Sequence, residues 1–449
     1  MSGAAEFPLI LRSMAAVPRR LPDLSAPSSL IKSGTAIDNS LTILQLPVMK
    51  KLSAKQKLHH IRRARRQNRG GRSPIGVSRR RQIRRTSMLY RGAEYTAKLS
   101  SDAIVRNFPK VMCFRRAPEA TLESFEYIRR ILHKSTKNRL WFKPNLNPRK
   151  SVTIRGYVSM SDVEEITTSA ALVLAAEYER KSMNMDEKPP LFDVANWDKK
   201  LTYKLKQIGF FRGFEFTPPE SDQDQGFGDV LTVPFYSGTK SEMKKVDEKL
   251  LKLVEHIDPG AEIGSDMLLA LNSAVGEAAM NTREHAYRDD HSFKYPHVSR
   301  WWATGAASVS DRKIVVSLYD QGVSIPVSYP KLPFFKSTVS SLIEFFDTSE
   351  SSPYVNDAKL IQAAARYGKS GRSLNPNGAD VASIGGFGLP QIKDAINLCG
   401  GGSLMILSRG GRYIYELDEG RPSEQLDTFD CSVGGTLIEW AVTLPKPVD

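Results

Sequence analysis

The chain has 449 residues, an apolar fraction of 41% that is ordinary for a globular protein, and a net charge of +15. This length allows two or three domains, and no stretch reaches the roughly 18 consecutive apolar residues of a transmembrane helix. The three cysteines, Cys113, Cys399 and Cys431, lie far apart, which argues against a disulfide framework or a structural zinc site. Because the sequence also lacks a secretory signal pattern, we expect a cytoplasmic protein.

The positive charge is concentrated in the N-terminal part of the chain. Residues 1–100 hold 21 Lys or Arg against 4 Asp or Glu, so the remainder is close to neutral. Like charges repel along the densest segment, Lys50–Arg91, and its glycines interrupt any long helix, which predicts a flexible arm over residues 1–100. The alternative is that this segment binds the phosphates of a nucleic acid, with little base stacking because Tyr90 is its only aromatic residue.

Residues 101–217 have the pattern of a small α/β domain. The expected elements are a strand at Val111–Phe114, a helix at Ala120–His133, a strand at Ser151–Val158, a helix from the capping box of Ser161 and Glu164 to about Lys181, a helix at Asp198–Ile208 that stops at Gly209, and a strand at Phe210–Phe216. This order resembles the STAS domains of anti-sigma-factor antagonists.

STAS domains carry a phosphorylatable Ser or Thr at a strand-to-helix turn. Ser159, Ser161, Thr167 and Thr168 lie near that point, but none matches it. The alternative is an unrelated α/β domain, and in either case we expect this part to sense or bind an unidentified protein partner. Residues 218–240 read as a polar linker followed by a strand at Val230–Tyr236, and an amphipathic helix at Ser241–His256 leads into the C-terminal part.

The most informative stretch is Ser265–Tyr287, which has the pattern of one amphipathic helix. Its apolar residues recur every three or four positions. Glu277, Asn281 and His285 follow one another at intervals of four, so a carboxylate, an amide and an imidazole lie along one polar edge. In isolation these three residues could equally form a solvated helix face.

Three further segments follow this helix in order. SLYDQGVSIP, residues Ser317–Pro326, places Asp320 and then Gly322 at the end of a strand. IGGFGLPQIKDAINLCGGGSLMILS, residues Ile384–Ser408, is a glycine turn, a helix and a strand, and GGTLIEWAVTLP, residues Gly434–Pro445, is a final strand. Together with the helix, these segments resemble the ATP-binding domain of gyrase-type ATPases, heat-shock chaperones, histidine kinases and mismatch-repair ATPases, the GHKL or Bergerat superfamily. The resemblance implies an α/β fold, an α+β two-layer sandwich, over residues 241–449, with ATP and Mg²⁺ as cofactors.

The resemblance also implies roles for individual residues. Asn281 would supply an oxygen ligand to Mg²⁺, which prefers such hard ligands. Glu277 would polarise the attacking water. Asp320 would accept a hydrogen bond from the adenine amino group, and Gly322 would let the backbone approach the ring. His285 would face the phosphates or pack beneath a lid, and the sequence leaves both open.

The glycine turn and the long connection before it would form the phosphate side of this site. Gly385, Gly386, Gly388 and Leu389 lie at a helix N-terminus, where backbone N–H groups favour phosphate. Residues 327–384 would be the ATP lid, with Lys369 and Arg372 reaching the γ-phosphate or remaining solvated. The chain departs from the family pattern at two positions, because Ser324 and Ile384 stand where glycines are common.

Seven histidines are present, and none has the HExxxP context of a histidine-kinase phosphoacceptor. The layout is most similar to anti-sigma-factor Ser/Thr kinases and stand-alone regulatory ATPases. The resemblance therefore implies an ATP- and Mg²⁺-binding regulatory protein in which slow ATP hydrolysis or protein Ser/Thr phosphorylation is coupled to partner binding. The alternative is a non-catalytic nucleic-acid-binding or interaction protein on a degenerate ATP-binding scaffold, which Ser324 favours and the set of Glu277, Asn281 and Asp320 opposes.

Overall fold

The computed structural model describes residues 84–134, 152–185, 188–219, 229–239, 244–259, 265–332, 335, 353–354, 356–367 and 388–444. The chain divides into two units, Met1–Arg79 and Arg80–Asp449, and every described residue belongs to the second. Most of the basic segment and most of the expected lid lie outside the described residues. So do four of the expected site residues, Lys369, Arg372, Gly385 and Gly386.

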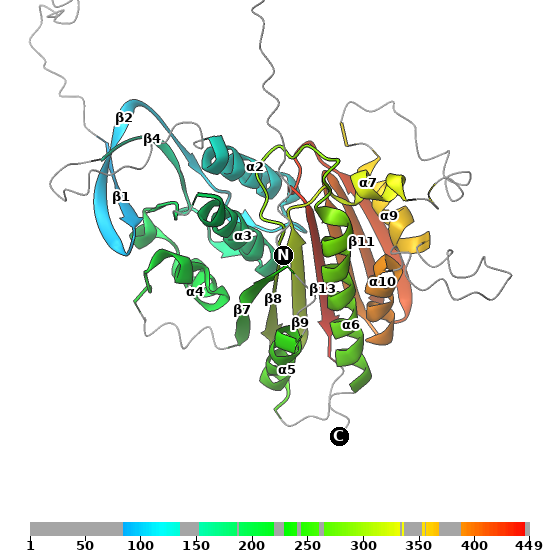
Figure 1. Cartoon of the computed structure of the whole chain (residues 1–449). Helices are drawn as coiled ribbons and strands as arrows, with labels where there is room; N and C mark the ends of the chain where they lie inside the picture. The colour runs from blue at the N-terminus through cyan, green and yellow to red at the C-terminus, as the bar shows by residue number, and fades with distance from the viewer. Residues whose placement is uncertain are drawn as a thin grey trace, which may run out of the picture. The chain divides into compact units, whose positions relative to one another are not determined.

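A seven-stranded sheet forms the centre of the described residues (Figure 1). Its strand order is β12-β11-β10-β13-β9-β8-β7, and all neighbouring strands are antiparallel. The strands are β7 (Val230–Gly238), β8 (Trp301–Ser308), β9 (Lys313–Asp320), β10 (Gly402–Ser408), β11 (Gly411–Asp418), β12 (Arg421–Thr428) and β13 (Thr436–Thr443). The mixture of helices and strands confirms the expected α/β class.

Four helices cover one face of this sheet, and Figure 1 shows α5, α6 and α10 in front of the strands. They are α5 (Lys244–Ile257), α6 (Ser265–Asn281), α9 (Asp357–Tyr367) and α10 (Gly388–Leu398). Side chains at alternate positions of a strand point to the same face. On β9, Ile314, Val316 and Leu318 pack with these helices. Asp320, two positions after Leu318, therefore lies on the same face.

Helices α2 (Pro118–Lys134) and α3 (Thr168–Met185) cover the opposite face of the sheet. Phe125 and Leu174 of these helices share one apolar core with Tyr319 of β9 and Leu437 of β13. The side chains of adjacent strand residues point to opposite faces of the sheet, so those of Tyr319 and Asp320 contact different helical layers. Residues from both ends of unit 2 thus bury the central sheet between two helical layers.

A second sheet, of order β4-β2-β1-β6, lies in the part that precedes β7. It contains β1 (Arg85–Tyr90), β2 (Ala93–Asn107), β4 (Val152–Ser159) and β6 (Leu191–Phe192), while β3 (Val111–Met112) pairs with β5 (Glu165–Ile166). The β1–β2 turn has positive φ at Arg91 and Gly92, 49° and 71°, as a two-residue hairpin of this twist requires. The remaining elements are α4 (Lys199–Ile208), α7 (Ile325–Ser328), the 3₁₀-helices η2 (Val194–Asn196), η3 (Phe210–Phe214) and η6 (Tyr329–Lys331), and the π-helix η5 (Thr282–Ala286).

Most expected elements of this region are present, including the helix that Asp198 caps and Gly209 ends with a φ of 85°. Three expectations were wrong. The arm expected over residues 1–100 does not reach residue 100, because Arg85–Tyr90 and Ala93–Asn107 form β1 and β2. The capping box at Ser161 does not open a helix, because Glu165–Ile166 pairs with β3 and α3 begins only at Thr168. The segment after Gly209 is the 3₁₀-helix η3 instead of a strand.

The 3₁₀ conformation of η3 is explained by its aromatic side chains. A repeat of three residues per turn directs Phe210, Phe211 and Phe214 into the core together, whereas a strand would alternate them between core and solvent. Phe210 and Phe214 both pack edge-on against Tyr178 of α3. Burial of three aromatic rings therefore outweighs the β propensity of the segment.

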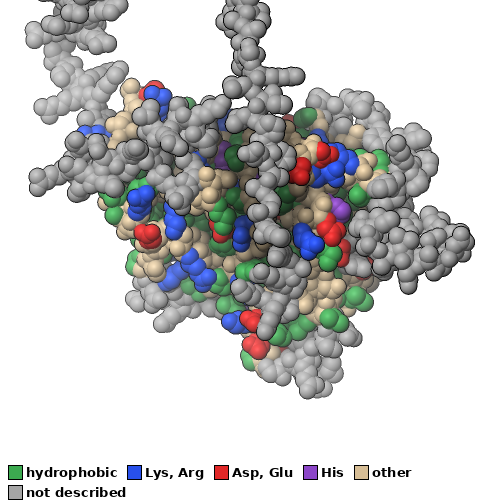
Figure 2. Space-filling model, viewed as in Figure 1, with side chains coloured by type: hydrophobic (Ala, Val, Ile, Leu, Met, Phe, Trp, Pro, Cys, Tyr) green, Lys and Arg blue, Asp and Glu red, His purple; other side chains and the backbone are tan. Residues whose placement is uncertain are grey.

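Among the described residues, no helix has the length and apolar character needed to span a bilayer. On the face seen in Figure 2, basic and acidic side chains are interspersed over the described surface. The described part of that face carries no extended region of one charge sign.

Candidate functional site

One cavity brings together residues from all four segments that the sequence analysis singled out. It lies on the sheet face covered by α6 and has a volume of about 70 Å³. Asn281 of α6, His285 of η5, Asp320 of β9, Leu389 of α10 and Thr436 of β13 line it. The remaining lining residues are Ala278, Thr282, Ala286, Ser324, Ile325, Ser328, Tyr329, Leu332, Ala364 and Ile438. The four segments, widely separated in sequence, thus meet at one point.

Asp320 is the only carboxylate among these lining residues. Its side chain is 5% exposed, and burial raises its pKa from 3.8 to about 6. Three donors partly offset this cost: the Gly322 amide at 2.8 Å from Oδ1, the Thr282 hydroxyl at 3.3 Å from Oδ2, and the Thr436 amide. A buried carboxylate held by fixed donors can accept one further hydrogen bond from a ligand.

Two glycines allow the backbone to close around Asp320. A Cβ on Gly322 would lie 2.3 Å from the Cβ of Ala286, and one on Gly435 would lie 1.9 Å from the carbonyl oxygen of Asp320. The Val323 amide donates to the Ala286 carbonyl at 2.8 Å, which ties the loop after β9 to the end of η5. The close approach at Gly322 is to Ala286 of η5, and the expected approach of the backbone to an adenine ring stays a prediction.

Ser324 stands where the family pattern has a second glycine, and it adopts a glycine-like backbone conformation. Its φ of 78° and ψ of 154° fall in a region that residues with a Cβ rarely occupy. The side chain is buried and its hydroxyl donates to the Val323 carbonyl. Ser324 therefore follows a backbone path suited to glycine at the cost of local strain.

Asn281 and His285 follow one another across a change of helix type. The α-helix ends at Asn281, and the next five residues form η5, a π-helical turn of a kind that often occurs at functional sites. Within the described residues, the buried Asn281 Nδ2 and His285 Nε2 have no hydrogen-bond partner. A carboxylate oxygen of Glu284 lies 4.0 Å from His285 Nε2, and burial lowers the pKa of the imidazole. Both groups are available to a ligand.

Asn281 is a residue of the cavity that could supply an oxygen ligand to a magnesium ion. No group of three or more His, Cys, Asp or Glu that could hold a metal occurs among the described residues. Mg²⁺ bound with a nucleotide needs few protein ligands, because phosphate oxygens and waters supply most of its coordination. The amide of Asn281 can present its oxygen to the cavity by a flip of the side chain.

Glu277 and the glycine turn occupy less central positions. Glu277 lies one turn before Asn281, is half-buried, and does not line the described cavity. Burial, together with the nearby Glu284, raises the pKa of its carboxyl group. Helix α10 begins at Gly388, as the glycine pattern predicts, and Leu389 is partly buried against the cavity.

Three hydroxyl groups at the site were missed by the sequence analysis. Thr282 reaches Asp320 as described, and the fully buried Ser408 lies 2.8 Å from the Thr436 hydroxyl. Ser408 also accepts a hydrogen bond from the Ile325 amide at 2.9 Å, which fixes the start of α7. Only Thr436 had a signal, since it follows the glycine pair of the last strand.

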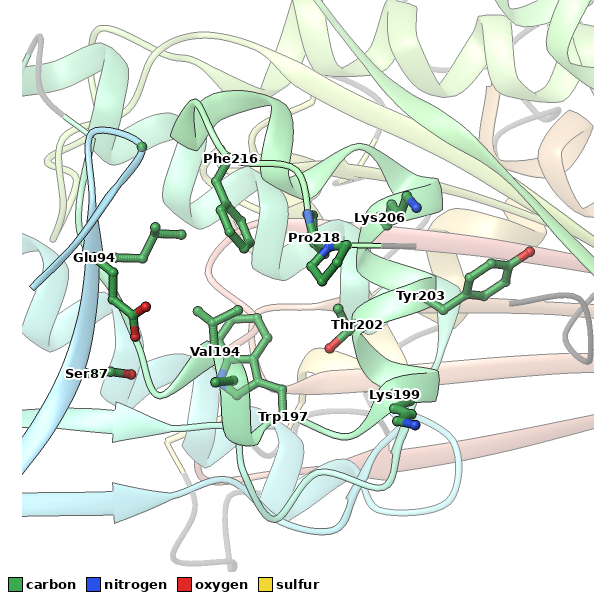
Figure 3. A pocket seen from close by; sticks show the side chains of 14 residues that line it. Ser87, Glu94, Val194, Trp197, Lys199, Thr202, Tyr203, Lys206, Phe216 and Pro218 are labelled. Atoms are coloured by element: carbon green, nitrogen blue, oxygen red, sulfur yellow. The ribbon is translucent and has the colours of Figure 1, made fainter. Parts of the chain in front are cut away.

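A second cavity, of about 390 Å³, lies between the β1–β2 hairpin and α4 (Figure 3). Figure 3 shows Val194, Trp197, Phe216 and Pro218 around the hollow, with Glu94 on the hairpin side. Trp197 donates its indole N–H to the Phe192 carbonyl, so its ring presents only apolar surface. None of the expected site residues lines this cavity, and the first cavity is therefore the candidate site.

Comparison of the chain with known protein families, curated proteins and solved structures found no match. The functional argument therefore depends on the residues of the cavity itself.

Proposed function

We propose that residues 241–449 form a Bergerat-type ATP-binding domain of the GHKL superfamily, and that the protein is an ATP- and Mg²⁺-binding regulatory protein. The observation that supports this proposal is the meeting of Asn281, His285, Asp320, Leu389 and Thr436 at one cavity. Together they represent all four segments on which the resemblance depends, with Asn281 and His285 from the same helical stretch. Unrelated surface residues from such distant segments would have no reason to converge.

In this proposal, the described cavity is the base-binding end of the site. Its volume of about 70 Å³ is well below the roughly 300–1,000 Å³ typical of complete ligand sites. Asp320 accepts a hydrogen bond from the adenine amino group, while Leu389 and Ile438 provide apolar contacts to the ring. The candidate γ-phosphate ligands Lys369 and Arg372 lie outside the described residues.

Asn281 holds the Mg²⁺ ion, whose charge offsets that of the phosphates. The N-terminus of α10 at Gly388 offers backbone N–H groups to the same phosphates. Glu277 is one turn from Asn281, and burial raises the pKa of its carboxyl group, which makes it a stronger base. These features support slow ATP hydrolysis or protein Ser/Thr phosphorylation, coupled to a partner that binds residues 101–217.

Calorimetric titration of the full chain with Mg-ATP tests this function. Wild type should bind, and Asn281→Ala should lose at least about tenfold in affinity when Mg²⁺ is present, because it removes the metal ligand. Asn272→Ala is the matched control: it changes the same residue type on the same helix but does not line the cavity. Phosphate release in the same samples separates hydrolysis from binding alone.

The alternative, a degenerate scaffold that binds nucleic acid through the segment Lys50–Arg91, predicts a different result. ATP would not bind at millimolar concentration, and association with RNA or DNA would weaken steeply with salt and be unchanged by Asn281→Ala. Absence of ATP binding by wild type would refute the ATP-binding proposal.

A further inference from the structure

A cluster of buried charged and hydroxyl groups lies directly behind the candidate site, on the opposite face of the sheet. It contains Arg129 of α2, Glu177 and Arg180 of α3, and Tyr319 of β9, each no more than 2% exposed. Arg129 Nη1 lies 3.4 Å from Glu177 Oε1, the Tyr319 hydroxyl lies 3.2 Å from the same oxygen, and Arg180 donates to Oε2. Burying paired charges contributes little net stability, so we expect the cluster to hold neighbouring groups in position.

Both terminal nitrogens of Arg129 also donate to the loop before β13. The guanidinium donates through Nη1 to the Val433 carbonyl and through Nη2 to the Ser432 carbonyl. The Tyr319 hydroxyl lies 3.1 Å from the Val433 carbonyl. Arg129 of α2, paired with Glu177 of α3, and Tyr319 of β9 therefore hold the loop that leads into Thr436 of the cavity.

This loop passes between Arg129 and Asp320 with no room on either side. A Cβ on Gly434, whose φ is 83°, would lie 2.6 Å from Arg129 Nη1. A Cβ on Gly435 would lie 1.9 Å from the Asp320 carbonyl. Because Tyr319 and Asp320 are neighbours with side chains on opposite faces, the cluster fixes the strand end that carries the site carboxylate.

We propose that Arg129 is a positioning residue for base recognition, which sets the discrimination between bases at Asp320 without touching the ligand. This inference depends on the proposed function. By holding the loop Ser432–Gly435 against β9, Arg129 keeps the Thr436 amide and the Asp320 carboxylate in register for a ligand amino group. The layer formed by α2 and α3 is therefore part of the nucleotide-selecting machinery.

The test is the ratio of the affinities for Mg-ATP and Mg-ITP, whose base has a carbonyl in place of the amino group. In the full chain, Arg129→Lys keeps the charge beside Glu177 but cannot hold both carbonyls with a planar fork. We expect the ATP affinity to fall about tenfold, and the ITP affinity to change by less than about threefold, because only the amino group needs an aligned acceptor. Unfolding midpoints of all variants show how much each change affects stability alone.

Arg412→Lys is the matched control. Arg412 is also buried, and it donates to the carbonyls of Phe114 and Arg115, so it joins the same two layers at β11, away from the cavity. It should lower the unfolding midpoint without changing the ATP-to-ITP ratio. A purely structural role of Arg129 would make the two variants behave alike.

The outcomes are distinguishable. An unchanged ratio for Arg129→Lys, or an equal loss for both nucleotides, overturns the role of Arg129 while wild-type ATP binding leaves the proposed function standing. Wild type that binds no ATP overturns both. If Arg129→Lys does not fold, Tyr319→Phe removes one hydroxyl from the same cluster. It should lower the ratio about threefold, the value of one modest hydrogen bond, and an unchanged ratio then overturns the inference.

Discussion

Replacing Asp320 by Asn measures the cost of the buried carboxylate. Burial raises its pKa from 3.8 to about 6. This difference of about two pH units corresponds to a free-energy cost of about 3 kcal/mol for keeping the carboxylate ionised in the native state. An amide of the same shape avoids this cost but gives up one of the hydrogen bonds from Thr282 or Thr436, about 1 kcal/mol. We expect Asp320→Asn to stabilise the empty protein by about 1–2 kcal/mol at pH 8.

The pH dependence has a definite sign. Because the folded pKa of Asp320 is above the unfolded value, the native state binds the proton more tightly, and wild type loses stability as the pH rises from about 4 to about 6. Asp320→Asn lacks this contribution. Its advantage over wild type should therefore grow across that window and stay constant above it.

Urea unfolding of both proteins at a series of pH values measures this difference. Asp357→Asn is the control, because burial raises the pKa of Asp357 to about 6 as well, yet it lies outside the cavity and accepts from the Gly410 amide at 3.0 Å. Both variants should show the pH dependence, whereas only Asp320→Asn should lose ATP binding. A variant that is less stable than wild type at pH 8, or a difference that does not vary with pH, would refute the reasoning.

Two further substitutions test local features of the site. Ser324→Gly should raise the unfolding free energy by about 1 kcal/mol, because it relieves a φ of 78°. Ser328→Gly is the control and should lower the unfolding free energy, because Ser328 has a helical φ of −82°. Equal effects of the two variants in thermal unfolding would contradict the strain argument. Glu277→Gln should keep ATP binding but reduce phosphate release by about 100-fold or more, as loss of a general base does. Glu284→Gln changes a nearby exposed carboxylate, and its rate of phosphate release should stay within about threefold of wild type. Similar rates for both variants would assign no catalytic role to Glu277.

Local chemistry explains what the sequence could predict. The apolar residues of α6 and β9 recur at the intervals of a helix and of a strand. This local spacing is enough to predict both elements and to place Asp320 at the end of β9. The stop at Gly209 follows from the left-handed conformation that glycine tolerates. These features need no knowledge of the remaining chain.

The features that the sequence missed depend on distant partners. Ser161 and Glu164 satisfy the capping rule, but pairing of the following residues with β3 prevents the helix. Ser408 reads as an ordinary strand residue until β13 brings Thr436 beside it. Arg129 is indistinguishable from a surface arginine of an amphipathic helix, because its acceptors at Ser432 and Val433 are at the other end of the chain.

The burial of the central sheet between two helical layers connects stability to recognition. Asp320 is desolvated by α6 and η5 on its own face, and the loop beneath it is fixed by Arg129 from the other face. The empty protein therefore carries a carboxylate with unused hydrogen-bonding capacity in a site of low polarity, which costs free energy. A ligand that brings an amino group to that carboxylate recovers part of this cost, whereas a carbonyl there would face an anion at close range. Under the proposed function, the burial that destabilises the empty site would favour an amino-bearing base over its keto analogue. Gly434 and Gly435, which lie against Arg129 and Asp320, are where the two layers meet.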